Sequence, residues 1–263
     1  MAKTILPGHG SGGKLMNEMI DTVIRKRFGA GNVQLDDSAI LTVGSSSIAF
    51  TTDTFTITPI FFPGGDIGRL AVNGTVNDLA VMGARPLYIS CALVLEEGLD
   101  FADLERILES MKSEADSAGV AIVTGDTKVV PNGKADKIFI NTSGIGIIDK
   151  RIQRREIVPG DRVIVSGTIG DHGMAIMALR NNLSFSRGLQ SDCAHLNRMI
   201  AKITDAYPDS IKFMRDPTRG GVASVLNEIV KGKQYSAMLS EEALPVRDEV
   251  KGVCGILGIE ALY

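Results

Sequence analysis

The chain has 263 residues, enough for about two domains at the usual ~150 residues each, and 28 basic against 31 acidic residues give a formal net charge of −3. This near-neutral balance offers no electrostatic basis for binding nucleic acid or an anionic membrane. Cys91, Cys193 and Cys254 lie far apart without a C-x-x-C pair, which excludes a disulfide framework and a zinc ribbon and leaves them as packing residues. The apolar stretches are too short to cross a bilayer, so we expect a cytoplasmic protein.

A glycine-rich segment from Gly8 to Lys14 precedes a predicted helix over 15–28. Glycines let backbone N–H groups approach an anion closely, so this segment is a candidate phosphate-binding loop. Its spacing nearly satisfies G-x-x-x-x-G-K-[ST], but Leu15 stands where a hydroxyl is needed and no strand precedes it. We therefore exclude a P-loop NTPase. The remaining interpretations are a flexible lid and a plain mobile N-terminus.

The first half alternates strands with helices. Apolar residues at helical spacing predict helices over 66–82 and 101–118. Runs rich in β-branched residues predict strands over 48–52, 120–124 and 138–148. The pattern indicates a mixed α/β domain.

A basic, polar run at 149–155 marks the expected boundary between domains 1–150 and 151–263, and is itself typical of a solvated linker. The second domain is predicted to begin with a strand over 162–166. A helix follows that strand and runs through Leu179. A later turn is predicted to start a second helix, with Asp216 as its cap and Pro217 in its first turn.

Asp78 falls on the apolar face of the predicted helix 66–82. A buried carboxylate needs a cation, a metal or good hydrogen-bond donors, and for one acid a structural ion pair is an equal alternative. Asp37, Asp53 and Asp126 lie at predicted strand ends or edges, where ligands of open sheets gather. Four carboxylates that converge there would suit a hard, oxygen-preferring cation, which we expect to be Mg²⁺ accompanied by phosphates.

Three further residues have both a chemical and a structural interpretation. Lys128 could neutralise a transferring phosphoryl group, or pair with the nearby Asp126. His172 is a candidate general base, or a polar turn residue, since the sequence shows no partner for it. Arg219 stands at a predicted helix start that could hold an anion.

The motifs of the chain resemble one known superfamily over essentially the whole length. They are Gly8–Gly13, Asp36–Ala39, Thr52–Asp53, Phe61–Gly65, Asn77–Ala84, Leu95–Gly98, Thr124–Lys128 and Arg215–Gly221. The residues of these motifs resemble those of aminoimidazole ribonucleotide synthetase, selenophosphate synthetase and thiamine monophosphate kinase. Within this superfamily, their order resembles the HypE family of [NiFe] hydrogenase maturation factors.

The resemblance implies an α/β (α+β) protein with a two-domain PurM-like ATP-binding fold, in which the N-terminal domain dimerises and the C-terminal domain covers the nucleotide. It implies a carbamoyl dehydratase, a lyase that uses ATP and Mg²⁺. The substrate would be a carboxamide carried on a C-terminal cysteine, and the resulting thiocyanate would supply the cyanide ligands of [NiFe] hydrogenase. The implied partners are a second copy of the chain, the carbamoyltransferase HypF and the iron-carrying HypC–HypD scaffold.

The residue patterns and the resemblance together give the candidate site residues. The candidate metal ligands are Asp37, Asp53, Asp78 and Asp126. The candidate nucleotide-binding residues are Gly10, Ser11, Gly12, Gly13, Asn77, Gly125, Thr127 and Arg219. The candidate catalytic residues are Lys128 and His172.

The sequence departs from the HypE pattern at its end. HypE proteins continue to a Pro-Arg-Ile-Cys type tail, whereas this sequence ends at Ala261–Tyr263, so we expect the second domain to be incomplete. One alternative is therefore an inactive ATP-binding or dimerising fragment. Another is a sibling enzyme such as selenophosphate synthetase, although its reactive cysteine or selenocysteine has no counterpart in residues 1–14.

Overall fold

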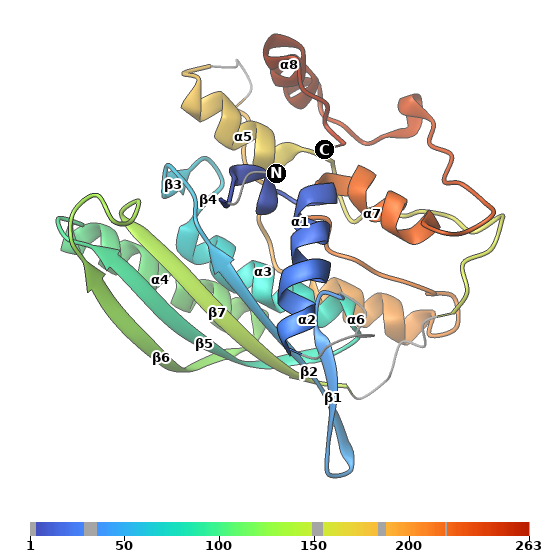
Figure 1. The fold of residues 1–263 in the computed structure, drawn as a ribbon, viewed down its shortest axis with the longest axis horizontal. Helices are drawn as coiled ribbons and strands as arrows, with labels where there is room; N and C mark the ends of the chain where they lie inside the picture. Colours follow the sequence, from blue (N-terminus) through green and yellow to red (C-terminus); the bar gives the residue numbers. More distant parts are fainter. Residues whose placement is uncertain (1–3, 29–35, 149–154, 184–187, 219, 263) are drawn as a thin grey trace. The chain divides into compact units, whose positions relative to one another are not determined.

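A computed structural model describes residues 4–28, 36–148, 155–183, 188–218 and 220–262 (Figure 1). They form two compact units. The first, which we call the sheet unit, is built from the described residues of Asp37–Val163 and Asp171–Asp216. The second, which we call the helical unit, is built from the described residues of Met1–Asp36, Ile164–Gly170 and Pro217–Tyr263.

A five-stranded sheet is the centre of the sheet unit, in the order β1-β2-β7-β5-β6. The strands are β1 (Ala39–Val43), β2 (Ser46–Phe55), β5 (Arg85–Glu96), β6 (Ala121–Val130) and β7 (Ile138–Ile147). All neighbours are antiparallel except β5 and β6. Parallel neighbours need a long crossover, and α4 (Phe101–Ala118) supplies it.

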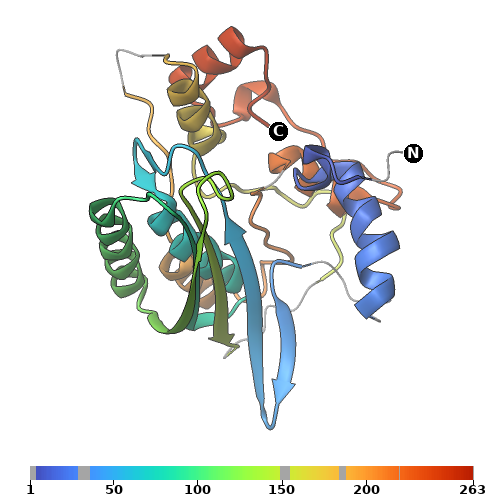
Figure 2. The ribbon, with the colours of Figure 1, turned by 60° about the vertical axis from the view of Figure 1, so that its left-hand side comes forward.

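Helices α3 (Ile67–Val81) and α4 cover one face of this sheet, as Figures 1 and 2 show. Each helix begins at an aspartate whose side chain accepts a backbone N–H, Asp66 for α3 and Asp100 for α4. The left-handed Gly119 ends α4. The main core lies between the helices and the sheet, and includes Ile67, Val72, Val76, Ile89, Ile107, Met111, Ile138 and Ile140.

Side chains alternate between the two faces of the sheet. In β2, Ala49, Thr51 and Phe55 are buried on the helix side, whereas Phe50 is exposed on the other side. We call that second surface, which α3 and α4 leave uncovered, the open face. The alternation decides which functional side chains can meet.

The remaining elements of the sheet unit are short. They are the β3–β4 hairpin (Phe61–Phe62 and Gly65–Asp66), α5 (Asp171–Arg180) and α6 (Asn197–Ala206). The helical unit contains a 3-10 turn at Pro7–His9, α1 (Gly13–Met19), a π-turn at Ile20–Ile24, α2 (Arg25–Phe28), α7 (Gly221–Val230), a second 3-10 turn at Glu241–Ala243 and α8 (Asp248–Leu257).

The predicted elements of the first half are confirmed, but the strands run further than expected. The strands predicted over 48–52 and 120–124 extend through Phe55 and Val130, because alternation and pairing continue past the aspartates. The strand predicted over 162–166 is wrong, since these residues join no sheet. The second-half helix begins at Gly221, with Gly220 as its cap, so the prediction of Asp216 as that cap is also wrong.

Within the part of the chain that the structure describes, no helix combines the length and the apolar character needed to cross a membrane. The division into domains at residue 150 stays a prediction.

Candidate functional site

Three of the four predicted metal ligands lie near one another in the sheet unit. Asp37 precedes β1, Asp53 lies within β2, and Asp78 lies in the last turn of α3. Asp53 pairs across the strands with Thr142, which is buried against α3, so Asp53 is on the helix side of the sheet. Asp37 and Asp53 both raise the pKa of Asp78 by charge repulsion, in addition to the effect of burial.

The Asp78 carboxyl group has an environment that disfavours its charge. Burial, together with repulsion from the neighbouring acids, raises its pKa to about 8, although a hydrogen bond from Thr51 opposes the shift. Thr51 Oγ1 lies 2.9 Å from Asp78 Oδ2 and 2.8 Å from the carbonyl oxygen of Asp37. One hydroxyl proton cannot serve both acceptors. The arrangement is fully satisfied when Asp78 carries a proton or when a cation binds its carboxylate.

A fourth carboxyl group joins these three from a segment that the sequence analysis interpreted as a helix cap. Asp216 belongs to the same acidic cluster: burial and repulsion from Asp53 and Asp192 raise its pKa to about 6, opposed by Arg215. Arg215 Nε lies 3.3 Å from Asp37 Oδ1. We call Asp37, Asp53, Asp78 and Asp216 the acidic cluster. The signal in the sequence was the charged pair Arg215–Asp216, which opens the motif Arg215–Gly221.

The donor set of the acidic cluster fits a hard divalent cation, because all four members are carboxylates and Mg²⁺ prefers oxygen. Burial and, to a smaller extent, mutual repulsion raise the pKa of Asp78 and of Asp216, and a bound cation would offset both effects by stabilising the charged carboxylates. Among the residues that the structure describes, however, no three His, Cys, Asp or Glu side chains are already close enough to hold a metal ion. The carboxylates would have to draw together on binding.

Asp126 does not converge with the acidic cluster within one chain. It shares a row across the sheet with Ala92, Asn141 and Thr54, one residue away from the row that contains Asp53. It therefore lies on the open face, three strand spacings or about 14 Å from β2. Within one chain, Asp126 therefore does not meet the other three predicted ligands, because β6 continues past Asp126 and leaves it in mid-strand. Its role as a metal ligand stays a prediction.

Lys128 lies two residues after Asp126 on the same exposed edge strand and on the same face. The two side chains thus form an opposite-charge pair of neighbours on the open face. Gly125 and Thr127 alternate with them and lie on the α4 side. A Cβ on Gly125 would collide with the carbonyl oxygen of Cys91, so close packing requires a glycine here.

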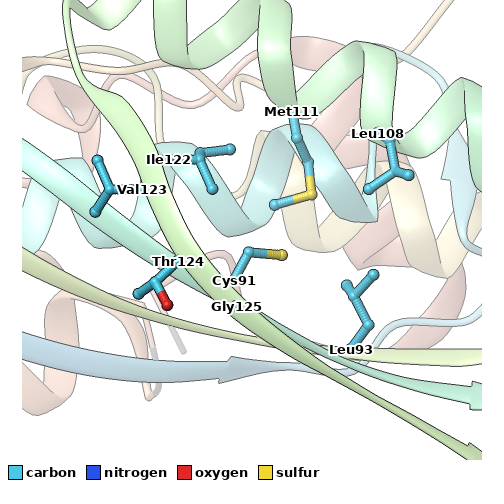
Figure 3. A pocket seen from close by; sticks show the side chains of 8 residues that line it. All are labelled: Cys91, Leu93, Leu108, Met111, Ile122, Val123, Thr124 and Gly125. Carbon is cyan, nitrogen blue, oxygen red and sulfur yellow. The ribbon is translucent and has the colours of Figure 1, made fainter.

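A small apolar cavity of about 410 Å³ opens between α4 and the β5–β6 edge (Figure 3). Its lining includes Cys91, Leu93, Met111 and Ile122. It lies on the opposite side of β6 from Asp126, and its lining includes no charged group. The cavity therefore offers no charge that could hold a phosphate or a metal ion.

His172 lies in the first turn of α5 and has the partner that the sequence could not show. Its Nδ1 is 2.9 Å from Ser191 Oγ, and its ring forms a T-shaped contact with the ring of Phe62 at a centroid distance of 5.4 Å. Burial lowers its pKa, with a smaller opposing effect of Asp192. Ser191 also donates its backbone N–H to Pro63 O, at 2.8 Å. The Phe61–Gly65 motif thus builds the surroundings of His172.

Asn77 has a structural use of its side chain. Its Oδ1 accepts the backbone N–H of Leu196 at 2.8 Å, and its Nδ2 donates to the carbonyl oxygen of Ala194 at 3.1 Å. Through these two hydrogen bonds, the side-chain amide of Asn77 holds α3 against the segment before α6. Nucleotide binding by Asn77 stays a prediction. The nucleotide would have to share the Asn77 amide with these two hydrogen bonds.

The glycine-rich segment belongs to the helical unit. Gly12 and Gly13 have φ values of 82° and 73°, a conformation that favours glycine, and Ser11 Oγ donates to Gly8 O at 3.4 Å. The backbone conformation alone therefore explains why residues 12 and 13 are glycines. The role of Gly10–Gly13 as a lid stays a prediction. Arg219 lies outside the described residues.

Both halves of the chain match the AIR synthase related proteins, with residues 35–148 matching their N-terminal domain and residues 158–263 their C-terminal domain. Carbamoyl dehydratase HypE of Bradyrhizobium diazoefficiens is 46% identical over 97% of this chain and 75% of that protein. A solved HypE structure in complex with ATP is 47% identical, covers 99% of this chain and 78% of its own, and has a TM-score of 0.79.

A chain of the solved HypE–HypF complex is 46% identical, covers 91% of this chain and 80% of its own, and has a TM-score of 0.81. These likenesses extend through both matched domains and far exceed what a shared fold alone requires. The motif resemblance is confirmed, and so is the mixed α/β, PurM-like fold. The chain therefore belongs to the HypE family of carbamoyl dehydratases, within the AIR synthase related proteins.

Proposed function

We propose that this chain is an ATP-dependent carbamoyl dehydratase of [NiFe] hydrogenase maturation, acting on a protein-bound S-carboxamide and yielding a thiocyanate. The observation that carries the proposal is 46% identity with a carbamoyl dehydratase over 97% of the chain. A relative solved with ATP supports ATP as the co-substrate. Because ATP is made and used in the cytoplasm, we place the protein there.

The reaction has a simple balance of atoms. The carboxamide oxygen attacks the γ-phosphorus of ATP and ADP leaves, which turns a poor leaving group into a phosphate ester. A base removes both N–H protons in the course of elimination, the C–O bond breaks, and phosphate departs with the oxygen. The carbon and nitrogen are left joined by a triple bond. The carboxamide has thus lost the elements of water, which end up in ADP and phosphate and not as free water.

We assign Mg²⁺ to the acidic cluster, where Asp37, Asp53 and Asp78 would hold it. When bound, the cation would offset the negative charge of the phosphates. Lys128 lies on the open face, so it would add a positive point charge near the transferred phosphoryl group only from the second copy of the proposed homodimer. His172, kept neutral by burial, is the candidate base. The rest of the proposed site follows the sequence predictions and comprises Asp126, Gly125, Thr127, Asn77, Arg219 and the Gly10–Gly13 lid.

We further propose that the chain forms a homodimer through the open face of the sheet. Phe50, Tyr88 and Ile145 are 39%, 50% and 39% exposed there, an unusual place for large apolar side chains on a sheet. HypF is the second proposed partner, supported by the solved HypE–HypF complex. The third proposed partner is HypC–HypD, as the acceptor of the cyano group. This proposal rests on the motif resemblance alone.

Asp78→Asn tests the proposed metal site. Groups around a metal typically contribute 10–100-fold, so we expect Mg·ATP to bind roughly tenfold or more weakly by isothermal titration calorimetry. The melting temperature without metal should not fall, because burial already disfavours the charged Asp78. Asp116→Asn, an exposed acid paired with Lys112, is the matched control. Unchanged nucleotide affinity in Asp78→Asn would contradict the assignment.

A second experiment separates an enzyme from a nucleotide-binding module. A peptide ending in S-carbamoyl cysteine is added to the chain with Mg·ATP, and ADP release and nitrile formation are measured. Peptide-dependent ADP release with nitrile formation supports the dehydratase. Tight Mg·ATP binding without either product would instead favour the alternative of an inactive ATP-binding or dimerising fragment.

A further inference from the structure

Ser191 forms a hydrogen bond with one of the two ring nitrogens of His172. Its Oγ lies 2.9 Å from Nδ1 in part-buried surroundings. Among the residues that the structure describes, Nδ1 has this protein partner, whereas Nε2 has none. The contact therefore orients the imidazole through one nitrogen and leaves the other nitrogen without a protein partner.

The position of Ser191 is fixed by contacts on both sides of it in the chain. Its backbone N–H donates to Pro63 O at 2.8 Å, and its Oγ accepts the backbone N–H of Cys193 at 3.1 Å. Gly64 packs so closely that a Cβ there would lie 2.8 Å from the backbone nitrogen of Ser191. Asn73, which is 1% exposed, donates its Nδ2 to Cys193 Sγ at 3.5 Å. The Ser191 hydroxyl is therefore presented by a packed segment that keeps other anchors when the hydroxyl is removed.

The Ser191 hydroxyl has the capacity to accept a proton-bearing nitrogen of His172. A serine oxygen has two acceptor lone pairs. One accepts the Cys193 N–H, and the second is available for Nδ1–H of His172. A neutral imidazole that carries its proton on Nδ1 keeps its lone pair on Nε2. When Nε2 then takes a proton, the Nδ1–H to Oγ hydrogen bond is unchanged, so the base works without any rearrangement of this contact.

Asp192, the next residue, relates this pair to the acidic cluster. It raises the pKa of His172, in opposition to the larger effect of burial, and it also raises the pKa of Asp216 by repulsion. Electrostatic effects weaken with distance, so Asp192 is near both groups. His172, the segment with Ser191 and the acidic cluster all belong to the sheet unit. The base and the proposed metal site are therefore in one neighbourhood.

We propose that Ser191 is a positioning residue, whose Oγ accepts Nδ1–H of His172 and thereby keeps the lone pair on Nε2, where it can take a proton from the carboxamide nitrogen. The inference rests on His172 as the base of the proposed function. As the proton moves to Nε2, the electron pair of the N–H bond forms the new carbon–nitrogen bond, and the C–O bond breaks with departure of phosphate. Ser191 exchanges no proton in this step.

The tautomer of His172 is measured by heteronuclear NMR of the imidazole nitrogens, in the full chain without substrate. The chain has three histidines, so His172→Gln assigns the signals of His172 by their loss. At about pH 8, above the ordinary pKa of histidine, we expect the Nδ1–H form in wild type. Ser191→Ala should give a mixture of both neutral tautomers, and Ser191→Thr, which keeps the hydroxyl, should retain the Nδ1–H form.

Ser117→Ala is the matched control, because Ser117 Oγ lies 2.9 Å from a ring nitrogen of another histidine, His195. The variant removes the same kind of contact from a histidine that has no part in the proposed reaction. It should leave the tautomer of His172 and the rate of nitrile formation unchanged.

Kinetics with the S-carbamoyl cysteine peptide and Mg·ATP provide the second readout. Ser191→Ala should lower kcat for nitrile formation about tenfold or more, because a general base contributes roughly 10²–10⁴-fold and depends on its orientation. The KM for the peptide and the affinity for Mg·ATP should stay at wild-type values, and Ser191→Thr should recover most of the rate. On the His172→Gln background, Ser191→Ala should have no further effect, because Ser191 acts through His172.

The possible outcomes are distinct. The Nε2–H form in wild type overturns the proposal, and this spectrum decides even if Ser191→Ala does not fold. A loss of kcat in Ser191→Ala with an unchanged tautomer means that Ser191 is merely structural, and also overturns it. A wild-type chain that shows the Nδ1–H form and its loss in Ser191→Ala, but makes no nitrile, contradicts the proposed function while supporting the positioning of His172 by Ser191.

Discussion

Two residues of the site carry charge states that only their surroundings determine. Asp78 is a carboxyl group whose pKa is raised to about 8, and His172 is an imidazole whose pKa is lowered, both chiefly by burial. In each case the neutral form is favoured, as burial requires. Neither shift follows from the residue type, although the position of Asp78 on an apolar helix face predicted that it would need a partner.

His172 gives a pH prediction with a definite sign. Because its folded-state pKa lies below its unfolded value of about 6.5, the folded protein binds fewer protons there than the unfolded chain. Its contribution to stability is therefore present above about pH 6.5 and is lost as the pH falls through the lowered pKa. His172→Gln should fall in melting temperature less steeply than wild type between roughly pH 7 and pH 5. Parallel curves would contradict this.

At the scale of elements, α3 is the helix that positions the site, and a glycine sets its distance from α4. A Cβ on Gly68 would lie 2.6 Å from the carbonyl oxygen of Ile107, which is backbone and cannot rotate away. The amphipathic pattern predicted both helices correctly, but it did not predict which residue of α3 lies at the contact with α4. The spacing of two helices is a property of the pair, and a single helical pattern does not contain it.

Gly68→Ala should destabilise the protein by about 1–3 kcal/mol, since the helices must separate to admit the methyl group. Gly173→Ala is the matched control in the same unit, because it also lies inside a helix but has open space around it. Alanine there should instead stabilise by about 0.5–1 kcal/mol, through helix propensity. Both values are checked by denaturant unfolding monitored by circular dichroism. Equal effects of the two substitutions would refute the close contact.

At the scale of the whole molecule, the two faces of the sheet carry different sets of functional residues. The helix side carries the core and the acidic cluster, while the open face carries Asp126, Lys128 and exposed apolar side chains. Alternation along each strand makes this separation unavoidable, since neighbouring residues point to opposite faces. Within a single sheet, Asp126 and the acidic cluster therefore lie on opposite faces and cannot bind the same ion.

Ile145→Glu tests the proposed homodimer, because it places a charge in the middle of the open face. We expect the variant to sediment as a monomer at concentrations where wild type is a dimer, with little loss of melting temperature beyond that due to dissociation. Phe101→Glu is the control: Phe101 is 80% exposed but lies on α4, away from the open face. A dimer that survives Ile145→Glu would rule out this face as the interface.

The sequence by itself determined the family, the α/β class, the helices over 67–81 and 101–118, and the need of Asp78 for a partner, because these depend on local periodicity and on contiguous motifs. The tertiary structure alone decided that Asp216 and Arg215 join Asp37 while Asp126 lies on the opposite face. The reason is physical: strand register and side-chain alternation determine which charges meet, and both depend on pairing between segments far apart in the chain.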